Sequence, residues 1–193
     1  MHDQERPTPW TTQQLVAKRV LYDELAREMD ALLTGETDCL ANAANAAAAI
    51  YHALPDLNWA GFYFVHGPDL VLGPFQGRPA CSRIPLGKGV CGTAAAERRS
   101  LLVPDVEAFP DHIACDTASR SELVVPLLTA DALFGVLDLD SPVLGRFDAQ
   151  DQTGCEALAA ITARHLRGAV SLCALGAMVG PGGRLPQRGG PRT

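Results

Sequence analysis

The stretch ELVVPLLTADALFGVLDLD, residues 122–140, decides the fold. Two runs rich in Val, Leu and Phe flank the residues around Thr129–Asp131, which predicts two strands joined by a tight turn and therefore an antiparallel hairpin. Side chains alternate across a strand, so Asp138 and Asp140 share one face while Leu137 and Leu139 occupy the other. Two acids at the end of an otherwise apolar strand are costly unless a cation or hydrogen-bond donors compensate them.

Glu122 begins the first strand of this hairpin. A three-residue turn would place it directly opposite Asp138 and on the same face, whereas a two-residue turn would direct it to the other face. Pro126 donates no hydrogen bond to the ladder. We predict the first register, which places Glu122, Asp138 and Asp140 in one pocket. The alternative is that these acids lie at an exposed strand end. In a pocket they could bind a cationic group or keep one carboxyl protonated as a proton donor.

The flanking sequence predicts helices before and after strands. Apolar residues recur at three- and four-residue steps from about Thr11 to Met29, and a second helix, capped by Asp38, is expected over residues 39–53. WAGFYFV (59–65) and LVLGPF (70–75) predict a hairpin, and residues 76–88 are expected to be largely loop. A short helix over 89–98, a short strand in LLVPDV (101–106), an ordered loop over 109–120 and a long helix opening at Asp148 complete the order. Helices and strands do not alternate regularly, so we predict an α+β fold with an antiparallel sheet.

The two ends of the chain differ from the rest. Residues 1–10 are polar with two prolines, and residues 176–193 are rich in Gly, Pro and Arg. We expect a mobile leader, one domain over residues 11–175 and a disordered tail.

Composition excludes several classes of protein. The 193 residues carry a net charge of −6 and only two lysines, so nucleic acid is an unfavourable partner. No apolar run reaches the roughly 18–20 residues of a membrane helix. The start MHDQERPTPW has no apolar segment of a secretory signal. We therefore predict a cytoplasmic protein whose six cysteines are free thiols rather than a disulfide framework.

The cysteines divide into two groups by position. Cys39, Cys155 and Cys173 lie among apolar residues of predicted helices and are expected to pack in the core. Cys81 and Cys115 lie in predicted loops. Cys91 follows Gly87-Lys88-Gly89-Val90 at a helix start, where the lysine and the helix dipole should favour a thiolate.

Zinc binding is the alternative for the loop cysteines. Nine residues separate Cys81 from Cys91 and twenty-three separate Cys91 from Cys115, with no C-x-x-C pair. Structural zinc sites usually need paired short spacings, so we predict a redox-active trio and no metal.

Four ordered segments carry a resemblance to a known family. They are NWAGFYFV, LGPFQGRPACSRIPLGKGVCGTAA, VPDVEAFPDHIACDTASRSELVVPL and GVLDLDSP. Over roughly residues 11–166 the chain resembles the free methionine-(R)-sulfoxide reductases, a catalytic branch of the GAF domains. The resemblance implies a six-stranded antiparallel sheet flanked by helices, a homodimer, and reduction of free methionine (R)-sulfoxide with thioredoxin as reductant and no cofactor.

By motif position, the resemblance also implies roles for individual residues. Cys115 matches the catalytic cysteine, Cys81 the main resolving cysteine and Cys91 an additional one that forms or relays disulfides. The matching substrate-site residues are Glu122, Asp138, Asp140, Trp59 and Tyr63. No role is implied for Cys39, Cys155, Cys173 or the tail.

From these residues we expect Cys115 to attack the sulfoxide sulfur, and Glu122 or Asp140 to donate a proton. Asp138 is expected to bind the substrate ammonium, and backbone amides of residues 115–119 the substrate carboxylate. Trp59 and Tyr63, four residues apart on one strand face, should form the apolar wall. A non-catalytic GAF sensor, a thiol switch and a peptide methionine sulfoxide reductase remain the alternatives.

Overall fold

A single antiparallel sheet organises the chain. The computed structural model describes residues 12–111, 113, 116–129 and 132–166. Its six strands are β1 (Trp59–His66), β2 (Asp69–Gly77), β3 (Arg83–Pro85), β4 (Leu101–Val103), β5 (Ser121–Leu128) and β6 (Leu133–Ser141). They lie in the order β3-β2-β1-β6-β5-β4, and every neighbouring pair is antiparallel. The predicted α+β class and six-stranded sheet are confirmed.

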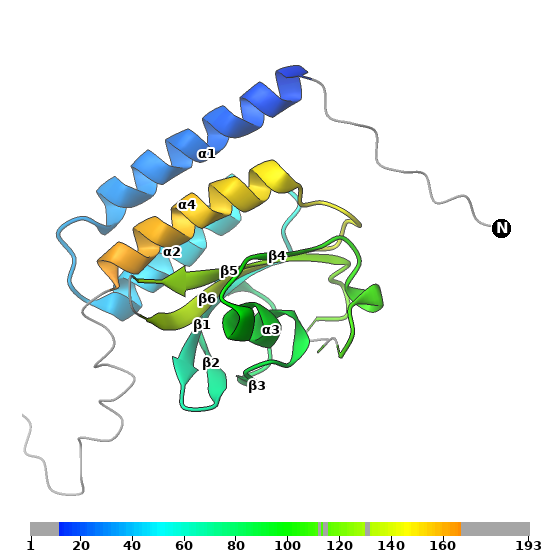
Figure 1. Ribbon diagram of the computed structural model, residues 1–193. Coiled ribbons are helices and arrows are strands. Elements are labelled where there is room, and N and C mark those ends of the chain that lie inside the picture. The colour runs from blue at the N-terminus through cyan, green and yellow to red at the C-terminus, as the bar shows by residue number, and fades with distance from the viewer. Residues whose placement is uncertain (1–11, 112, 114–115, 130–131, 167–193) are drawn as a thin grey trace, which may run out of the picture.

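Helices cover the two faces of the sheet unequally. The helices α1 (Thr12–Leu33), α2 (Cys39–Ala53) and α4 (Ala149–His165) lie on one face, and α3 (Gly89–Glu97) lies on the other (Figure 1). A single 3₁₀ turn, η1 (Val106–Ala108), follows β4. The face that carries α3 is therefore the one left for loops and a site.

The alternation of side chains sorts the core into two clusters. Leu123, Val125, Leu137 and Leu139 point toward α1, α2 and α4 and are at most 2% exposed. Val124 and Val136 point the other way, toward α3. The period of two that the sequence displays in 122–140 thus decides which residues face the α3 side.

The predicted helix starts are confirmed at two aspartates. The Asp38 side chain accepts a hydrogen bond from the backbone amide of Ala41 at the start of α2. Asp148 caps α4 and forms a capping box with Asp151. These caps satisfy amide groups that a helix cannot bond internally.

One strand escaped prediction. Within the segment expected to be largely loop, β3 pairs with β2 through Arg83↔Val71, Ile84↔Leu70 and Pro85↔Asp69. Three residues that include a proline are too short to show a period. Ile84 is 3% exposed, and its burial against the α3-side core holds the strand in place.

In the β5–β6 hairpin the three acids share one face as predicted, but the strands pair in a different register. Glu122 pairs with Asp140 and Val124 with Asp138, so the prediction that Glu122 directly opposes Asp138 is wrong. The register shifts between Leu127 and Leu128, where a bulge moves the pairing by one residue. From Ser121 to Leu127 the numbers of the two paired residues still add up to an even number. Glu122 therefore shares its face with both aspartates.

The ends of the chain lie outside the described residues. This includes the predicted leader 1–10 and the predicted tail 176–193. No helix in the described part of the chain combines the length and apolar character needed to cross a membrane.

Candidate active site

Three carboxylates meet on the α3 side of the sheet. Strand pairing places Asp140 between Trp59 of β1 and Glu122 of β5, and places Asp138 opposite Gly61 of β1. Glu122 and Asp138 are each 6% exposed. All three acids line one pocket, so the prediction of a shared carboxylate pocket is confirmed and the exposed strand end is excluded.

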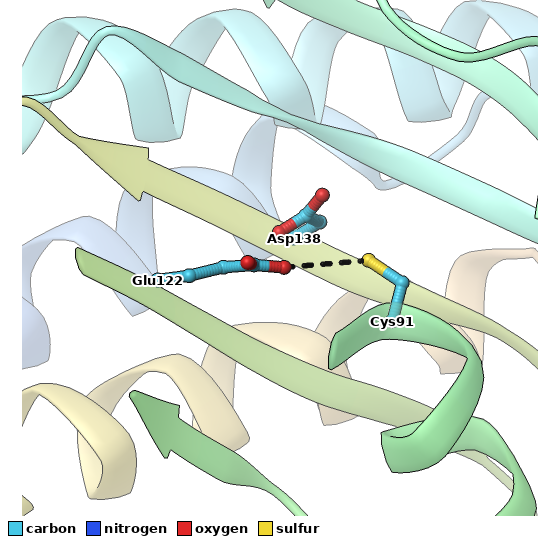
Figure 2. Close-up of side chains that lie close together, drawn as sticks. All are labelled: Cys91, Glu122 and Asp138. Atoms are coloured by element: carbon cyan, nitrogen blue, oxygen red, sulfur yellow. Dashed lines mark hydrogen bonds between the residues drawn. The ribbon is translucent and has the colours of Figure 1, made fainter. Parts of the chain in front are cut away.

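Cys91 completes this cluster from above the sheet. It lies in the first turn of α3 and is 3% exposed. Figure 2 shows its thiol pointing toward Glu122 on β5, with Asp138 on β6 beside them. The Cys91 Sγ lies 3.8 Å from Glu122 Oε1, at the limit of a hydrogen bond involving sulfur.

Burial and mutual repulsion shift the acids toward their protonated forms. Burial, the charge of Asp138 and that of Asp140 raise the pKa of Glu122 well above its usual range. Burial and the charge of Asp138 do the same to the pKa of Asp140. Burial raises the pKa of Asp138 to about 6, against which hydrogen bonds with Cys91 and Glu122 act. With a pKa of about 6, Asp138 is largely ionised at neutral pH, and the pKa values of its two neighbours are shifted toward the protonated form.

The predicted thiolate at Cys91 is wrong. Burial, followed by the charges of Asp138 and Glu122, raises the pKa of the Cys91 thiol well above its usual range. The lysine expected to stabilise a thiolate, Lys88, instead forms an ion pair with Asp111 at 3.0 Å. Position at a helix start predicts a low pKa only where nearby acids do not outweigh the helix dipole.

The aromatic pair lies beside the acids. Trp59 and Tyr63 share a face of β1, as predicted, with ring centroids 5.8 Å apart and planes at 26°. Phe75 of β2 also stacks on Trp59, with ring centroids 5.3 Å apart. Burial, then the charge of Asp138, raises the pKa of Tyr63.

The pocket itself is small. Its volume is about 30 Å³, and its apolar lining is Ile84, Val90 and Ile113. This space holds about one water-sized group. An entire amino acid can enter only if the surrounding side chains separate.

The same atoms have the spacing of a metal-ligand set. One ligand atom from each of Cys91, Glu122 and Asp138 lies within 4.8 Å of the others. A thiol and two carboxylates are donors that a divalent cation accepts. This set differs from the Cys81, Cys91 and Cys115 combination weighed from the sequence, because it draws its oxygens from the sheet.

The structure separates the remaining cysteines by environment. Cys81 is half-buried and disulfide-bonded, whereas Cys39, Cys91 and Cys155 are free and buried. The disulfide departs from the expectation that all six cysteines are free thiols. Cys39 and Cys155 lie in the helix-side core, which confirms their packing role. Cys115 and Cys173 lie outside the described residues.

A polar network that the sequence analysis did not assign borders the acids. Asn58, directly before β1, donates hydrogen bonds from Nδ2 to Asp116 Oδ2 at 3.2 Å and to Ser119 Oγ at 3.0 Å. A hydrogen bond from Ser119 lowers the pKa of Asp140, against the larger effect of burial. The signal in the sequence was the polar Asn58 preceding an apolar strand and the D-x-x-S spacing of 116–119, which is typical of a turn.

A larger hollow lies away from this cluster. It is an open groove of about 670 Å³, bordered by Arg98, Arg99, Leu102, Pro126 and Gln152 among others. Its lining includes no cysteine or aspartate, so the convergence of thiol and carboxylates marks the smaller pocket as the chemical site.

Comparison with known proteins agrees with this geometry. The model of the GAF domain family matches residues 28–166. The free methionine-R-sulfoxide reductase of Escherichia coli (strain K12) is 51% identical over 143 residues, which is 74% of this chain and 87% of that protein. The chain belongs to the free methionine-R-sulfoxide reductase family of GAF-domain proteins.

Other members of this reductase family match over similar lengths. The free methionine-R-sulfoxide reductase of Saccharomyces cerevisiae is 41% identical over 74% of this chain and 83% of its own length. A solved structure of the Neisseria meningitidis enzyme in complex with its substrate is 41% identical, with a TM-score of 0.76 over 89% of this chain and 99% of that one. The reductase resemblance inferred from the motifs and the GAF fold are therefore confirmed.

Proposed function

We propose that this protein reduces free methionine (R)-sulfoxide to methionine. The observation that carries the proposal is the convergence of Cys91 with Glu122, Asp138 and Asp140 in one buried pocket. This pocket occurs in a chain that is 51% identical to a free methionine-R-sulfoxide reductase. The cluster supplies both a negative charge and protonated carboxyl groups, which are what a substrate with an ammonium and a sulfoxide requires.

The three acids have different pKa shifts, from which we assign them different roles. Asp138, with a pKa of about 6, is ionised at neutral pH and binds the substrate ammonium. The pKa values of Glu122 and Asp140 lie well above their usual ranges, so either residue can donate a proton to the sulfoxide oxygen as its bond to sulfur breaks. Trp59 and Tyr63 provide the apolar surface beside them.

The covalent steps use the cysteines in sequence. The Cys115 thiol takes the oxygen of the sulfoxide, so the substrate S–O bond breaks and a Cys115 sulfenic acid and methionine form. Two electrons pass from the Cys115 sulfur to the substrate sulfur. The Cys81 thiol then condenses with the sulfenic acid, which forms a disulfide and releases water. A dithiol reductant, thioredoxin, returns two electrons and two protons.

Cys91 requires a deprotonation step in this scheme. As a buried neutral thiol it must lose its proton before it can accept or pass on a disulfide. Glu122 lies 3.8 Å from its sulfur and is the group placed to take that proton when the carboxylate is ionised.

Hydrogen bonds within the 116–119 turn limit which backbone amides can bind the substrate carboxylate. Two amides of the 115–119 segment are already used, because Ala118 N donates to Asp116 Oδ1 at 2.9 Å and Ser119 N donates to the Asp116 carbonyl at 3.2 Å. The role falls to the other amides of that segment. A carboxylate held there and an ammonium held at Asp138 would restrict the enzyme to the free amino acid, because a residue within a peptide lacks both charges.

The reductase would act in the cytoplasm as a homodimer with thioredoxin as its partner. The homodimer and thioredoxin rest on the family resemblance, and the cytoplasmic location rests on the sequence, which shows no apolar run of membrane length and no secretory signal.

The cysteine roles are tested by a coupled assay in which NADPH and thioredoxin reductase keep thioredoxin reduced. Cys115→Ser should abolish NADPH oxidation with free methionine (R)-sulfoxide. Cys81→Ser should produce about one methionine per protein and then stop. Cys39→Ala is the matched control, because this thiol is buried in the helix-side core, and it should turn over as the parent protein does.

Two results contradict the assignments. Substantial turnover by Cys115→Ser would mean that the nucleophile is another residue, and sustained turnover by Cys81→Ser would remove its resolving role. A sensor or a thiol switch, the alternative functions, would show no substrate-dependent loss of NADPH even with all cysteines intact.

A further inference from the structure

Asn58 joins two parts of the site that are far apart in sequence. Its side-chain amide donates to Asp116 and Ser119, at 3.2 and 3.0 Å. Its backbone amide donates to the carbonyl of Asp140 at 3.1 Å. One residue at the start of β1 therefore bonds both the 116–119 turn and the strand that carries the acids.

The turn is braced internally as well. Asp116 accepts from the amides of Ala118 and Ser119, and the Arg78 guanidinium lies 3.9 Å from Asp116 Oδ1. The side chain of Asp116 is only 9% exposed. The turn thus holds its own shape, and Asn58 determines where that turn lies relative to the sheet.

Ser119 transmits this contact to the acids. The residue is 7% exposed. Burial raises the pKa of the Asp140 carboxyl, and the nearby Ser119 hydroxyl acts against that rise. A hydroxyl carries a single proton. Because Asn58 Nδ2 donates to Ser119 Oγ, the Ser119 proton remains available for Asp140.

The orientation of the Asn58 amide is forced. Its Oδ1 is buried and has no hydrogen-bond partner among the described residues. Flipping the amide would place a carbonyl oxygen against the Asp116 carboxylate and would withdraw both donated hydrogen bonds. Such an unsatisfied buried atom persists only where the surrounding contacts require it.

We propose that Asn58 is a positioning residue of this active site, which holds the 116–119 turn on β1 and directs the Ser119 hydroxyl to Asp140. The inference deepens the proposed reductase function, since Asp140 is one of its two candidate proton donors. Asn58 itself acts through Ser119 and touches neither reacting atom.

Several ionisable groups face Asp140 and must be unchanged by the test. They are Asp138 on the same strand, Glu122 on β5, Asp116 in the turn, Tyr63 on β1 and Cys91 on α3. The variants chosen are therefore neutral ones. Asn58→Leu is close in shape and removes both donated bonds, Ser119→Ala removes the hydroxyl, and Ser119→Thr retains it.

The direct measurement is the titration of the Asp140 carboxyl carbon by NMR in the reduced full-length protein, assigned with Asp140→Asn. Asn58→Leu and Ser119→Ala should each raise the pKa of Asp140 by about 0.5–1 unit, the size expected for one lost hydrogen bond to the charged form. The double variant should shift it no further than Ser119→Ala alone, because both act through the same hydroxyl. Ser119→Thr should restore the parent value.

Asn42→Leu is the matched control. Asn42 is also a buried asparagine whose Nδ2 donates once, to the Glu36 carbonyl, and whose Oδ1 lacks a partner among the described residues, but it lies on α2 in the other layer. It should lower stability without moving the Asp140 titration. If Asn58→Leu fails to fold by circular dichroism, the Ser119 pair and Asn58→Ser carry the same comparison.

The outcomes separate this inference from the proposed function. An Asp140 pKa that is unmoved in folded Asn58 and Ser119 variants overturns the positioning role, whatever the enzyme does. Shifts that are additive in the double variant also overturn it. A shifted pKa with an unshifted alkaline limb of kcat/KM supports the positioning role and assigns proton donation to Glu122. A shifted pKa in a protein with no sulfoxide reduction supports the inference and refutes the reductase.

Discussion

Glu122 lies at the centre of the proposed chemistry because it contacts both the thiol and the carboxylates. Its side chain approaches Cys91 at 3.8 Å, and burial, followed by the neighbouring acids, raises its pKa well above the usual range. An amide in its place keeps the shape and loses the acid. The residue therefore offers the sharpest single-atom test of general acid catalysis in this pocket.

Glu122→Gln should lower kcat for free methionine (R)-sulfoxide by about 10²–10⁴-fold, the usual contribution of a positioned general acid. The KM should change little, because the ammonium is assigned to Asp138. Steady-state kinetics in the thioredoxin-coupled assay measure both constants. Glu156→Gln, an exposed acid-to-amide change on α4, is the control and should match the parent. A Glu122→Gln enzyme within a few-fold of the parent would assign proton donation to Asp140.

Asp138 predicts a pH dependence of stability with a definite sign. Its pKa is about 6 in the folded protein, raised by burial from the ordinary value near 4 of an unfolded chain. Between these two values the folded state holds the extra proton, so the free energy of unfolding falls as pH rises. The shift of about two units corresponds to roughly 3 kcal/mol at most.

Urea unfolding of the parent and of Asp138→Asn between pH 4 and pH 7 measures this contribution. The parent should lose stability relative to the variant as pH rises through 6, and the difference should level off above it. Groups outside the cluster titrate equally in both proteins, so the difference reports Asp138 together with the change it causes in the pKa values of Glu122 and Asp140. Parallel stability curves would mean that Asp138 is not desolvated.

Individual residues also show where sequence reasoning reached its limit. Alternation alone placed Glu122, Asp138 and Asp140 on one face, because a period of two is independent of long-range contacts. The ionisation of Cys91 did not follow from its helix position, since its pKa is raised by burial and then by acids on strands distant in sequence. The roles of Asn58 and Ser119 depend on a contact between residues 61 positions apart.

At the scale of elements, the packing of α4 on α1 relies on one glycine. A Cβ at Gly154 would lie 2.3 Å from the ring of Tyr22 on α1. Tyr22 is itself fixed by a hydrogen bond from its hydroxyl to Asp151 at 2.8 Å. The ring therefore cannot move aside cheaply, and the two helices approach through the missing side chain.

Gly154→Ala should lower the free energy of unfolding by about 1–3 kcal/mol, the usual cost of overpacking. In an exposed helix the same change stabilises by up to about 1 kcal/mol. A decrease in the free energy of unfolding therefore points to the contact with the Tyr22 ring and not to helix propensity. Urea unfolding followed by circular dichroism gives the value. Gly154→Ala in a Tyr22→Leu background should cost less, and an equal cost there would mean that the ring is not the obstacle.

The β5–β6 hairpin shows which properties of an element the sequence determines. The strands and the shared face follow from the pattern of 122–140. The partner of Glu122 differs by two residues from the prediction, because four residues rather than three separate the pair Leu128↔Leu133 and a bulge at Leu127/Leu128 adds one more. The turn closes through the Thr129 amide, which donates to the Ala132 carbonyl at 2.9 Å. The short β3 was missed because tertiary burial of Ile84, rather than local pattern, creates it.

At the scale of the whole molecule, the sheet separates structure from chemistry. One face packs on α1, α2 and α4, and the other carries the acids, the aromatic pair and Cys91 beneath α3. The family motifs and the element order predicted this architecture well, since both are local in sequence. The size of the pocket could not be predicted, because its volume of about 30 Å³ is set by residues from four separate elements and one loop.

The proposed substrate is free methionine (R)-sulfoxide, and a comparison of three sulfoxides tests this assignment. The reduced full-length protein is assayed for methionine release from free methionine (R)-sulfoxide, free methionine (S)-sulfoxide and the (R)-sulfoxide within an N-acetylated, C-amidated peptide. The free (R)-sulfoxide should turn over. The kcat/KM for the free (S)-sulfoxide and for the capped peptide should be lower by at least about 10²-fold, because a charge or the sulfoxide oxygen is then misplaced. Equal turnover of the capped peptide, or no turnover of the free (R) form, would contradict it.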